Sequence, residues 1–430
     1  MTFARRTQEI EPFLAVEVAE RAQELERAGI DVVHLEFGEP DFEAPPAIRD
    51  ALARAIKDGR TRYTHSLGIL PLREAIAEHY AQTYGVTISP EQILVTAGTS
   101  PAMLLLFGHL LNPGDEVVLS DPYYACYPNF IRYAEGEPVY VGVTEEDNFQ
   151  YRPEAIQNRI GPRTRAIVIN SPANPTGTVL SAERMAAIGA LSRDGGPLIV
   201  SDEIYHGLSY EGRDRTILEF TDRAFVLNGF SKAYAMTGWR LGWVVAPRDH
   251  IRALQTLYGN FFISTNEFVQ WAGVAALREA SDDSRRFRAI FDERRRVMVA
   301  GLRSLGFGVG AEPTGAFYVL ANARHLSTDS VRLAREILET SHVAVTPGAA
   351  FGTNAEGYLR FSYASSLERI QEGLERLRRL RRRSPRRGPV ALVVPGSTRR
   401  HPRRAPPRKR RRRSRPSWMR SSEDAYEKRR

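Results

Sequence analysis

The stretch Asn228–Trp243, which reads NGFSKAYAMTGWRLGW, holds the residue with the clearest chemical potential, Lys232. Within residues 1–380 the only other lysine is Lys57, although arginine is abundant there. A buried lysine can lose its proton and attack a carbonyl carbon, whereas the guanidinium of arginine stays protonated. The sequence therefore favours Lys232 as a nucleophilic amine over a solvated lysine on a loop.

Two further groups of polar residues follow short apolar runs. Gly98, Thr99 and Ser100 come after the apolar run 93–96 and before an apolar helix predicted over 102–111. Free N–H groups at a helix start, together with two hydroxyls, form a seat for an anion. Serine and threonine are also ordinary helix caps, so this signal is weak by itself.

The second group is SDEIYHG, in which Asp202 ends an apolar run and Tyr205 follows three residues later. A carboxylate in this place either caps a turn or pairs with a cation. An anion seat, a carboxylate, a phenol and the amine of Lys232 together match the needs of pyridoxal phosphate. Its phosphate requires N–H, hydroxyl and arginine groups, its pyridine nitrogen requires an acid, and its aldehyde requires a lysine.

The elements that must position these groups alternate between helix and strand. Apolar residues at helical spacing predict helices over 16–27, 46–57, 72–84 and 102–111. Short aliphatic or β-branched runs predict strands over 93–96, 116–120, 166–170, 198–201, 225–227 and 243–246. This alternation predicts an α/β fold with a mostly parallel sheet that helices cover on both faces. Ligands of such sheets bind at the carboxyl ends of the strands.

The pattern changes after about residue 270 to a long helix, followed by strands near 317–320, 343–345 and 358–363. We therefore expect a second, smaller α+β domain. The predicted division has four parts: an N-terminal segment that joins the small domain (1–45), a large domain that binds pyridoxal phosphate (46–270), the small C-terminal domain (271–380) and a disordered tail rich in Arg and Pro (381–430).

The net charge of +9 comes from the tail. Residues 381–430 hold 20 Lys and Arg against three Asp and Glu, which leaves 40 basic and 48 acidic residues in the body. The body is thus mildly acidic, and nucleic acid could bind only through the tail, which we consider an incidental extension. The single cysteine, Cys126, the lack of a signal-peptide pattern and the lack of a long apolar run predict a cytoplasmic protein without a membrane span. The nine histidines show no metal-ligand spacing.

Five stretches, in the order expected, resemble class I aminotransferases, the fold-type I pyridoxal-phosphate enzymes of the aspartate aminotransferase superfamily: GEPDF, NSPANPTG, SDEIY, SKAYAMTGWRLGW and YLRFSYA. The resemblance runs from about residue 8 to residue 380. It implies pyridoxal 5'-phosphate as cofactor and a homodimer whose active sites lie at the subunit interface.

The resemblance also implies a role for each matching residue. Lys232 would form the Schiff base and then shuttle a proton between the substrate α-carbon and the cofactor. Asp202 would pair with the pyridine nitrogen, while Tyr205 and Asn174 would hydrogen-bond the ring oxygen. Further cofactor contacts would come from Gly98, Thr99, Ser100, Ser231 and Arg240 around the phosphate, Tyr124 stacked on the ring, and Tyr63 lent by the partner subunit. The substrate carboxylate would be held by Arg360, Asn174 and the backbone of Gly38, and a bidentate arginine suits a carboxylate.

The sequence thus predicts an aminotransferase that moves an α-amino group between an L-amino acid and a 2-oxo acid. A β-eliminating lyase that uses pyridoxal phosphate stays open as an alternative, because the same residues would serve it. A regulator that binds the cofactor without turnover is a second alternative, and a protein that binds nucleic acid through its tail is a third.

The substrate side chain is where the sequence is least specific. In relatives that favour dicarboxylates, a threonine near the N-terminus and a lysine after the Gly-rich turn are expected. Here those places read Pro12-Phe13-Leu14-Ala15 and Gly98-Thr99-Ser100, so both polar groups are missing. Phe13, Leu14 and Ala15 would instead make that wall apolar. We therefore expect aspartate to be a poor donor, and alanine or a larger apolar or aromatic amino acid to be a better one. Glutamate with 2-oxoglutarate stays open as an alternative if another arginine moves into the site.

Overall fold

The computed structural model describes residues 3–383. The tail predicted over 381–430 lies outside the described residues from residue 384 onward, so its predicted character is untested.

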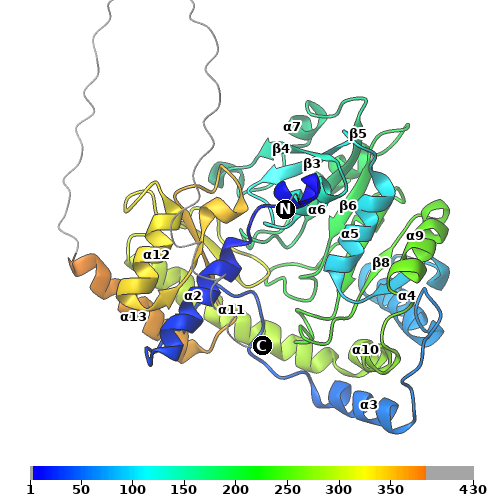
Figure 1. The fold of residues 1–430 in the computed structure, drawn as a ribbon, viewed down its shortest axis with the longest axis horizontal. Coiled ribbons are helices and arrows are strands. Elements are labelled where there is room, and N and C mark those ends of the chain that lie inside the picture. The colour runs from blue at the N-terminus through cyan, green and yellow to red at the C-terminus, as the bar shows by residue number, and fades with distance from the viewer. Residues whose placement is uncertain (1–2, 384–430) are drawn as a thin grey trace, which may run out of the picture. The chain divides into compact units, whose positions relative to one another are not determined.

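A seven-stranded sheet forms the centre of the described chain (Figure 1). Its strand order is β2 (Ile93–Thr96), β8 (Gly242–Val245), β7 (Ala224–Gly229), β6 (Leu198–Asp202), β5 (Thr164–Asn170), β3 (Glu116–Asp121) and β4 (Glu137–Gly142). The five strands from β7 to β4 are parallel, and β8 is antiparallel to both of its neighbours, β7 and β2. The predicted α/β fold with a mostly parallel sheet is confirmed.

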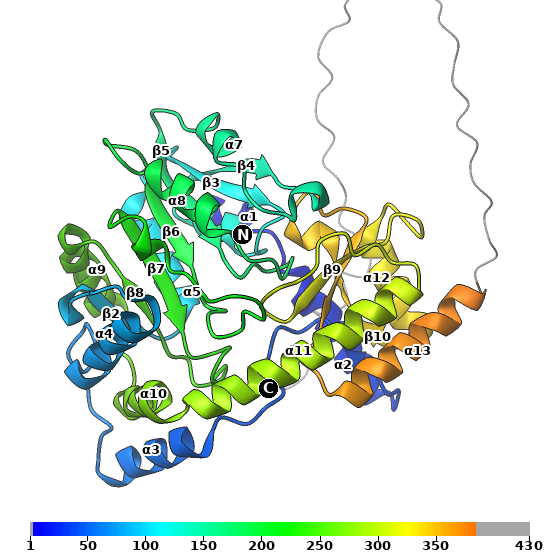
Figure 2. The same ribbon diagram turned by 180° about the vertical axis from the view of Figure 1, so that it is seen from behind.

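Helices pack on both faces of this sheet, as expected for parallel strands whose side chains are apolar on both sides. One face is covered by α5 (Thr99–Leu110), α6 (Tyr127–Tyr133) and α9 (Arg248–Phe261). The opposite face is covered by α4 (Leu70–Tyr84), α8 (Ala182–Ala190) and α10 (Glu267–Glu279), and Figure 2 shows α8 in front of the sheet.

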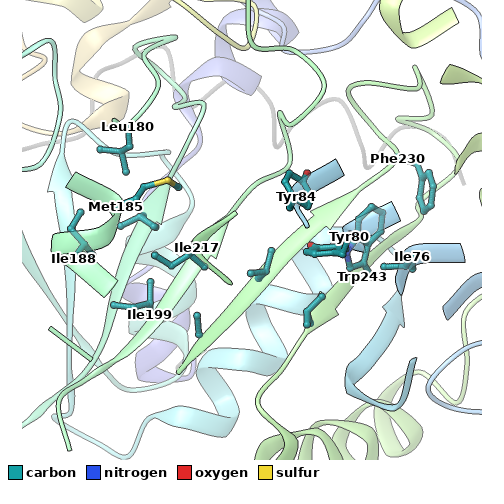
Figure 3. Packing of buried hydrophobic residues seen from close by; sticks show 14 of the residues in the cluster. Ile76, Tyr80, Tyr84, Leu180, Met185, Ile188, Ile199, Ile217, Phe230 and Trp243 are labelled. Atoms are coloured by element: carbon teal, nitrogen blue, oxygen red, sulfur yellow. The ribbon is translucent and has the colours of Figure 1, made fainter. Parts of the chain in front are cut away.

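Alternate strand residues supply the two cores. Ile199 of β6 and Val226 of β7 face the α4 and α8 side, whereas Val200 and Phe225 face the α5 side. In Figure 3, which shows part of the first core, Trp243 packs against Tyr80, and its indole nitrogen lies 3.4 Å from the Tyr80 hydroxyl. The two cores fix the positions of the strand ends, which carry the polar groups singled out above.

A second set of elements has a core of its own. It contains the antiparallel sheet of β11 (Thr346–Pro347), β12 (Tyr358–Ser362) and β9 (Tyr318–Asn322), and the parallel pair of β1 (Val33–His34) and β10 (Val343–Ala344). The helices beside them are α2 (Leu14–Arg27), α11 (Ser281–Ser304), α12 (Ser330–Ser341) and α13 (Leu367–Arg383). Figure 2 shows α11 as the long helix that runs from α10 to this region. The predicted domain boundaries stay predictions.

The remaining helices of the described chain are short or peripheral. They are α1 (Arg5–Gln8), α3 (Pro46–Lys57), α7 (Pro153–Gln157) and the 3₁₀ turns η1 (Pro90–Gln92), η2 (Glu145–Asp147), η3 (Ile217–Glu219) and η4 (Gly348–Phe351). Within residues 3–383, none of the helices combines the length and the apolar character needed to cross a lipid bilayer.

Candidate active site

A cavity of about 220 Å³ lies where the carboxyl ends of the parallel strands meet the second set of elements. Eleven of the residues predicted for the site line it: Gly38, Thr99, Ser100, Tyr124, Asn174, Asp202, Tyr205, Ser231, Lys232, Arg240 and Arg360. They come from segments that are far apart in the sequence, so the fold itself assembles them. This is the place where ligands bind in open α/β sheets.

Lys232 follows β7 in the chain, and its side chain lines the cavity. The Nζ atom donates a hydrogen bond to the carbonyl oxygen of Gly38 at 2.7 Å. Burial lowers the pKa of Lys232 to about 8, and the nearby cations Arg240 and Arg360 act in the same direction. Glu39 and Asp202 oppose this shift. A substantial fraction of the amine is therefore neutral near physiological pH, and the neutral form is the nucleophile.

Asp202 is the last residue of β6, and its side chain is buried. One carboxylate oxygen accepts a hydrogen bond from the Tyr127 hydroxyl at 2.7 Å, and the other accepts one from the N–H of Ile204 at 3.2 Å. Burial raises the pKa of Asp202, although both hydrogen bonds and the nearby Lys232 oppose that shift. A buried carboxylate that faces a cavity is well suited to a cationic ring nitrogen, which would stabilise its ionised form.

The residues predicted for a phosphate group meet at the start of α5. Gly98 has a φ of +95°, and a Cβ atom there would lie 2.6 Å from an Nη atom of Arg240. Only glycine therefore allows the guanidinium to approach the helix start so closely. Arg240 donates to the Thr237 carbonyl at 2.8 Å and forms no ion pair with a carboxylate of residues 3–383. A guanidinium without an ion-pair partner at a helix N-terminus, beside the hydroxyls of Thr99 and Ser100, is well suited to bind a phosphate group.

Arg360 projects from β12 and is almost completely buried. One terminal nitrogen donates to the side-chain oxygen of Asn174 at 2.9 Å, and the other donates to the Glu36 carbonyl and the Thr346 hydroxyl. Its Nε atom is buried and has no hydrogen-bond partner among the described residues. A buried guanidinium with an unused donor and no paired carboxylate suits a substrate carboxylate.

Tyr205 lies in the turn that follows β6, and its hydroxyl lies 2.9 Å from the Tyr318 hydroxyl. The Tyr318 ring also lies 4.4 Å from the Arg360 guanidinium carbon. A Cβ atom at Gly38 would come within 1.9 Å of the same Tyr318 hydroxyl, so position 38 has room only for glycine. Tyr318 therefore links three of the predicted site residues.

Tyr127 and Tyr318 line the cavity, yet sequence reasoning missed them both. In the sequence each stands in an apolar run and resembles an ordinary core residue. Tyr127 lies 75 positions from Asp202 and Tyr318 lies 113 positions from Tyr205, so no local spacing connects either pair. The only signal was the hydroxyl itself, because a buried tyrosine usually requires a hydrogen-bond partner.

Two predicted residues do not line the cavity. Gly98 acts through the close approach of Arg240 described above. Tyr63 is 80% exposed and contributes nothing to the cavity of its own chain. Its predicted role, a contact in the active site of a partner subunit, stays a prediction.

The family model for aminotransferase class I and II matches residues 30–377. A curated relative, the aspartate/prephenate aminotransferase of Thermus thermophilus, is 40% identical over 385 residues, which cover 88% of this chain and 98% of the relative. The (5-formylfuran-3-yl)methyl phosphate transaminase of Methanocaldococcus jannaschii is 38% identical over 87% of this chain and 98% of its own length.

Solved structures agree with these matches. The Thermus thermophilus aspartate aminotransferase with maleate superposes with a TM-score of 0.85 at 39% identity, and the match covers 88% of this chain and all of that one. An aminotransferase from Mycobacterium tuberculosis gives a TM-score of 0.84 at 35% identity, covering 88% and 99% of the two chains. The chain thus belongs to the class I and II aminotransferases, enzymes with the fold-type I architecture. It is a transaminase that depends on pyridoxal phosphate.

Proposed function

We propose that the cavity around Lys232 is the active site, and that Lys232 is the residue that binds the cofactor covalently and moves the proton of the reaction. The observation that carries this proposal is the position of its amine. The amine has a pKa lowered to about 8, and it shares the cavity with a carboxylate, a free guanidinium and a buried guanidinium. Lys57, by contrast, lies exposed on the surface helix α3.

The cavity offers a complementary group to each part of the cofactor. Thr99, Ser100, Ser231 and Arg240 would bind the phosphate, and Tyr124 would stack on the ring. Asp202 would hold a proton on the ring nitrogen, while Tyr205 and Asn174 would hydrogen-bond the ring oxygen. When bound, pyridoxal phosphate supplies an electron sink that makes the α-proton of an amino acid acidic.

The chain's own residues would then position the amino acid and move that proton. Arg360 would hold the α-carboxylate, with its orientation fixed by Asn174, Thr346 and the ring of Tyr318. The Lys232 amine, which lines the same cavity as Arg360, would in its neutral form accept the proton and later return it. Tyr127 keeps the Asp202 carboxylate oriented toward the cavity.

The test of this function is a reaction with defined products. The protein loaded with pyridoxal phosphate is mixed with a panel of L-amino acids and 2-oxo acids. We expect equal amounts of a new amino acid and a new 2-oxo acid. Pyruvate and ammonia would identify a β-eliminating lyase instead, and a change in the cofactor spectrum without any product would identify a regulator.

We further propose that the protein is a cytoplasmic homodimer. A hydrogen bond of 3.1 Å from the Thr64 N–H to the Ser264 hydroxyl holds the segment that carries Tyr63 beside the segment that carries Phe261 and Ile263. All three side chains are exposed, and exposed apolar side chains that gather on one surface favour an interface. Light scattering should give twice the chain mass, and replacing Phe261 and Ile263 by aspartate should shift it to the monomer mass. A native chain that scatters as a monomer would contradict this proposal.

A further inference from the structure

The cavity holds three cations among its lining residues, Lys232, Arg240 and Arg360. In the proposed function each of them is already engaged, because Lys232 binds the cofactor, Arg240 its phosphate and Arg360 the α-carboxylate. No fourth lysine or arginine, and no histidine, lines the cavity among the residues that the structure describes. A second carboxylate on the substrate would therefore find no cationic partner among the cavity residues of one subunit.

The anionic residues of the cavity add to this restriction. Glu36 and Asp202 both line it, and both are buried. One oxygen of Glu36 lies 2.7 Å from His34, whereas the other is buried without a hydrogen-bond partner among the described residues. A distal carboxylate would thus lose its water in a cavity that already holds two carboxylates, Asp202 engaged by the ring nitrogen and Glu36 paired with His34, and this is unfavourable.

The remaining wall of the cavity is apolar. It is formed by six side chains from four separate segments, which together are called the Phe13 wall: Phe13, Ala15, Val16, Phe37, Met103 and Phe130. Phe13 stands at the start of α2, and its ring meets Tyr124 edge to face at a centroid distance of 6.2 Å. Phe37 is 42% exposed and Val16 is 43% exposed, so both present apolar surface that a ligand could cover.

We propose that the Phe13 wall selects an L-amino acid donor with an aromatic side chain. The proposal rests on the proposed function, since it requires the α-carboxylate at Arg360. Phenyl rings and a thioether are good partners for another ring, through edge-to-face and sulfur–aromatic contacts. A methyl side chain would cover little of this surface, and aspartate would carry an unpaired charge into it.

The experiment uses the holoenzyme and follows the absorbance of the bound cofactor after mixing with a single donor, so that no acceptor affects the result. L-phenylalanine, L-alanine and L-aspartate are compared by kcat/KM of this half-reaction. We expect phenylalanine to exceed alanine at least about tenfold and aspartate by about thirtyfold or more. Aspartate or alanine as the preferred donor would overturn the proposal.

Two substitutions at Phe13 locate the effect. Phe13→Ala should lower kcat/KM for phenylalanine about tenfold more than that for alanine, because only the larger side chain reaches the wall. Phe13→Arg should raise the ratio of aspartate to phenylalanine, because it supplies the missing cation. Phe3→Ala, the same change at a residue that is 68% exposed and outside the cavity, is the matched control and should alter neither ratio.

The outcomes separate this proposal from the function on which it rests. If Phe13→Ala lowers kcat/KM equally for all donors, with the cofactor spectrum unchanged, then Phe13 does not discriminate between donor side chains. That result would overturn the proposal. Reaction with aspartate or alanine in preference to phenylalanine leaves the transaminase site in place and removes only the aromatic assignment. Absence of any reaction with every donor contradicts the proposed function itself.

Discussion

Asp202 and Glu203 are neighbouring carboxylates at the end of β6, both buried, and they have opposite surroundings. Asp202 lines the cavity beside Lys232. Glu203 shares its side of the chain with Ser201, whose hydroxyl donates to it at 2.8 Å, as expected for residues two apart in an extended strand. One residue thus faces the ligand cavity, and the other faces the packed interior.

The hydrogen bonds around Glu203 are those of a structural group. One oxygen accepts from Ser201, from the Thr216 hydroxyl at 3.1 Å and from the Ile217 N–H at 3.0 Å. The other lies 3.5 Å from His206, which in turn lies 2.8 Å from the hydroxyl of Tyr84, a residue labelled in Figure 3. Burial raises the pKa of Glu203, as it does for Asp202. Asp202 and Glu203 thus share their type of side chain, their burial and the direction of their pKa shift. The groups that each carboxylate contacts are what distinguish the functional residue from the structural one.

The largest expected effect is at Lys232, which lines the same cavity as Asp202. Lys232→Ala should lower kcat by about 10⁴-fold or more, because it removes both the nucleophile and the proton carrier. The thermal midpoint measured alongside should change little. Lys57→Ala, on the exposed face of α3, is the control with the same change and should keep full activity. Turnover in Lys232→Ala at the native rate would contradict the assignment.

Asp202→Asn should come next, with kcat lower by about 10²–10³-fold. The amide keeps the shape of the carboxylate and can still accept from Tyr127, but it cannot hold a proton on a ring nitrogen. Steady-state kinetics and a urea titration, run together, measure the two effects. If only stability falls, by the ~0.5–2 kcal/mol of a lost cap, then Asp202 resembles Glu203 and the contrast between them is wrong.

The pH dependence of cofactor uptake should follow the lowered pKa of Lys232. Below a pKa of about 8 the amine is mainly protonated, so the rate should rise about tenfold per pH unit and become constant above pH 8. Stopped-flow mixing of the apoprotein with pyridoxal phosphate measures this rate. A rate that continues to rise up to pH 10 would indicate a lysine with an ordinary pKa.

Glu203→Gln should have the smallest effect on catalysis and a clear effect on stability. The amide keeps an oxygen for Ser201, Thr216 and Ile217 but loses the charge that faces His206. We expect the free energy of unfolding to fall by about 1–3 kcal/mol, with kcat of the folded enzyme within about threefold. A loss of activity as large as that of Asp202→Asn, at unchanged stability, would remove the distinction between the two carboxylates.

The sequence predicted the regular elements well where local signals were strong. The helix predicted over 46–57 was found as Pro46–Lys57, since proline at the first helical position and an amphipathic pattern both mark it. Strand β4 (Glu137–Gly142) was missed, because it is an edge strand that starts with an exposed Glu137 and a proline. Helix α5 begins at Thr99, three residues before its predicted start, because Thr99, Ser100 and Pro101 resemble a turn.

The candidate site was predictable to the extent that each group has a motif. Lys232, Asp202 and Arg360 stand in stretches that resemble the family, and the structure brings them into one cavity. Phe13 and Ala15 were expected in the wall of the substrate pocket and line the cavity, whereas Leu14, expected beside them, does not. Tyr318 and the other members of the Phe13 wall could not be predicted in this way. Their significance depends on contacts between segments that only the folded chain brings together, such as the Phe13 ring against Tyr124.

The most direct test of the role of Lys232 is to locate the covalent bond between chain and cofactor. The holoenzyme is reduced with borohydride and digested, and the peptide that carries the phosphopyridoxyl group is sequenced by mass spectrometry. We predict that the group is on Lys232, in the peptide AFVLNGFSK or one that overlaps it, and that Lys57 carries none. A phosphopyridoxyl group on Lys57, or no modified lysine in a holoenzyme that is active, would contradict the central claim.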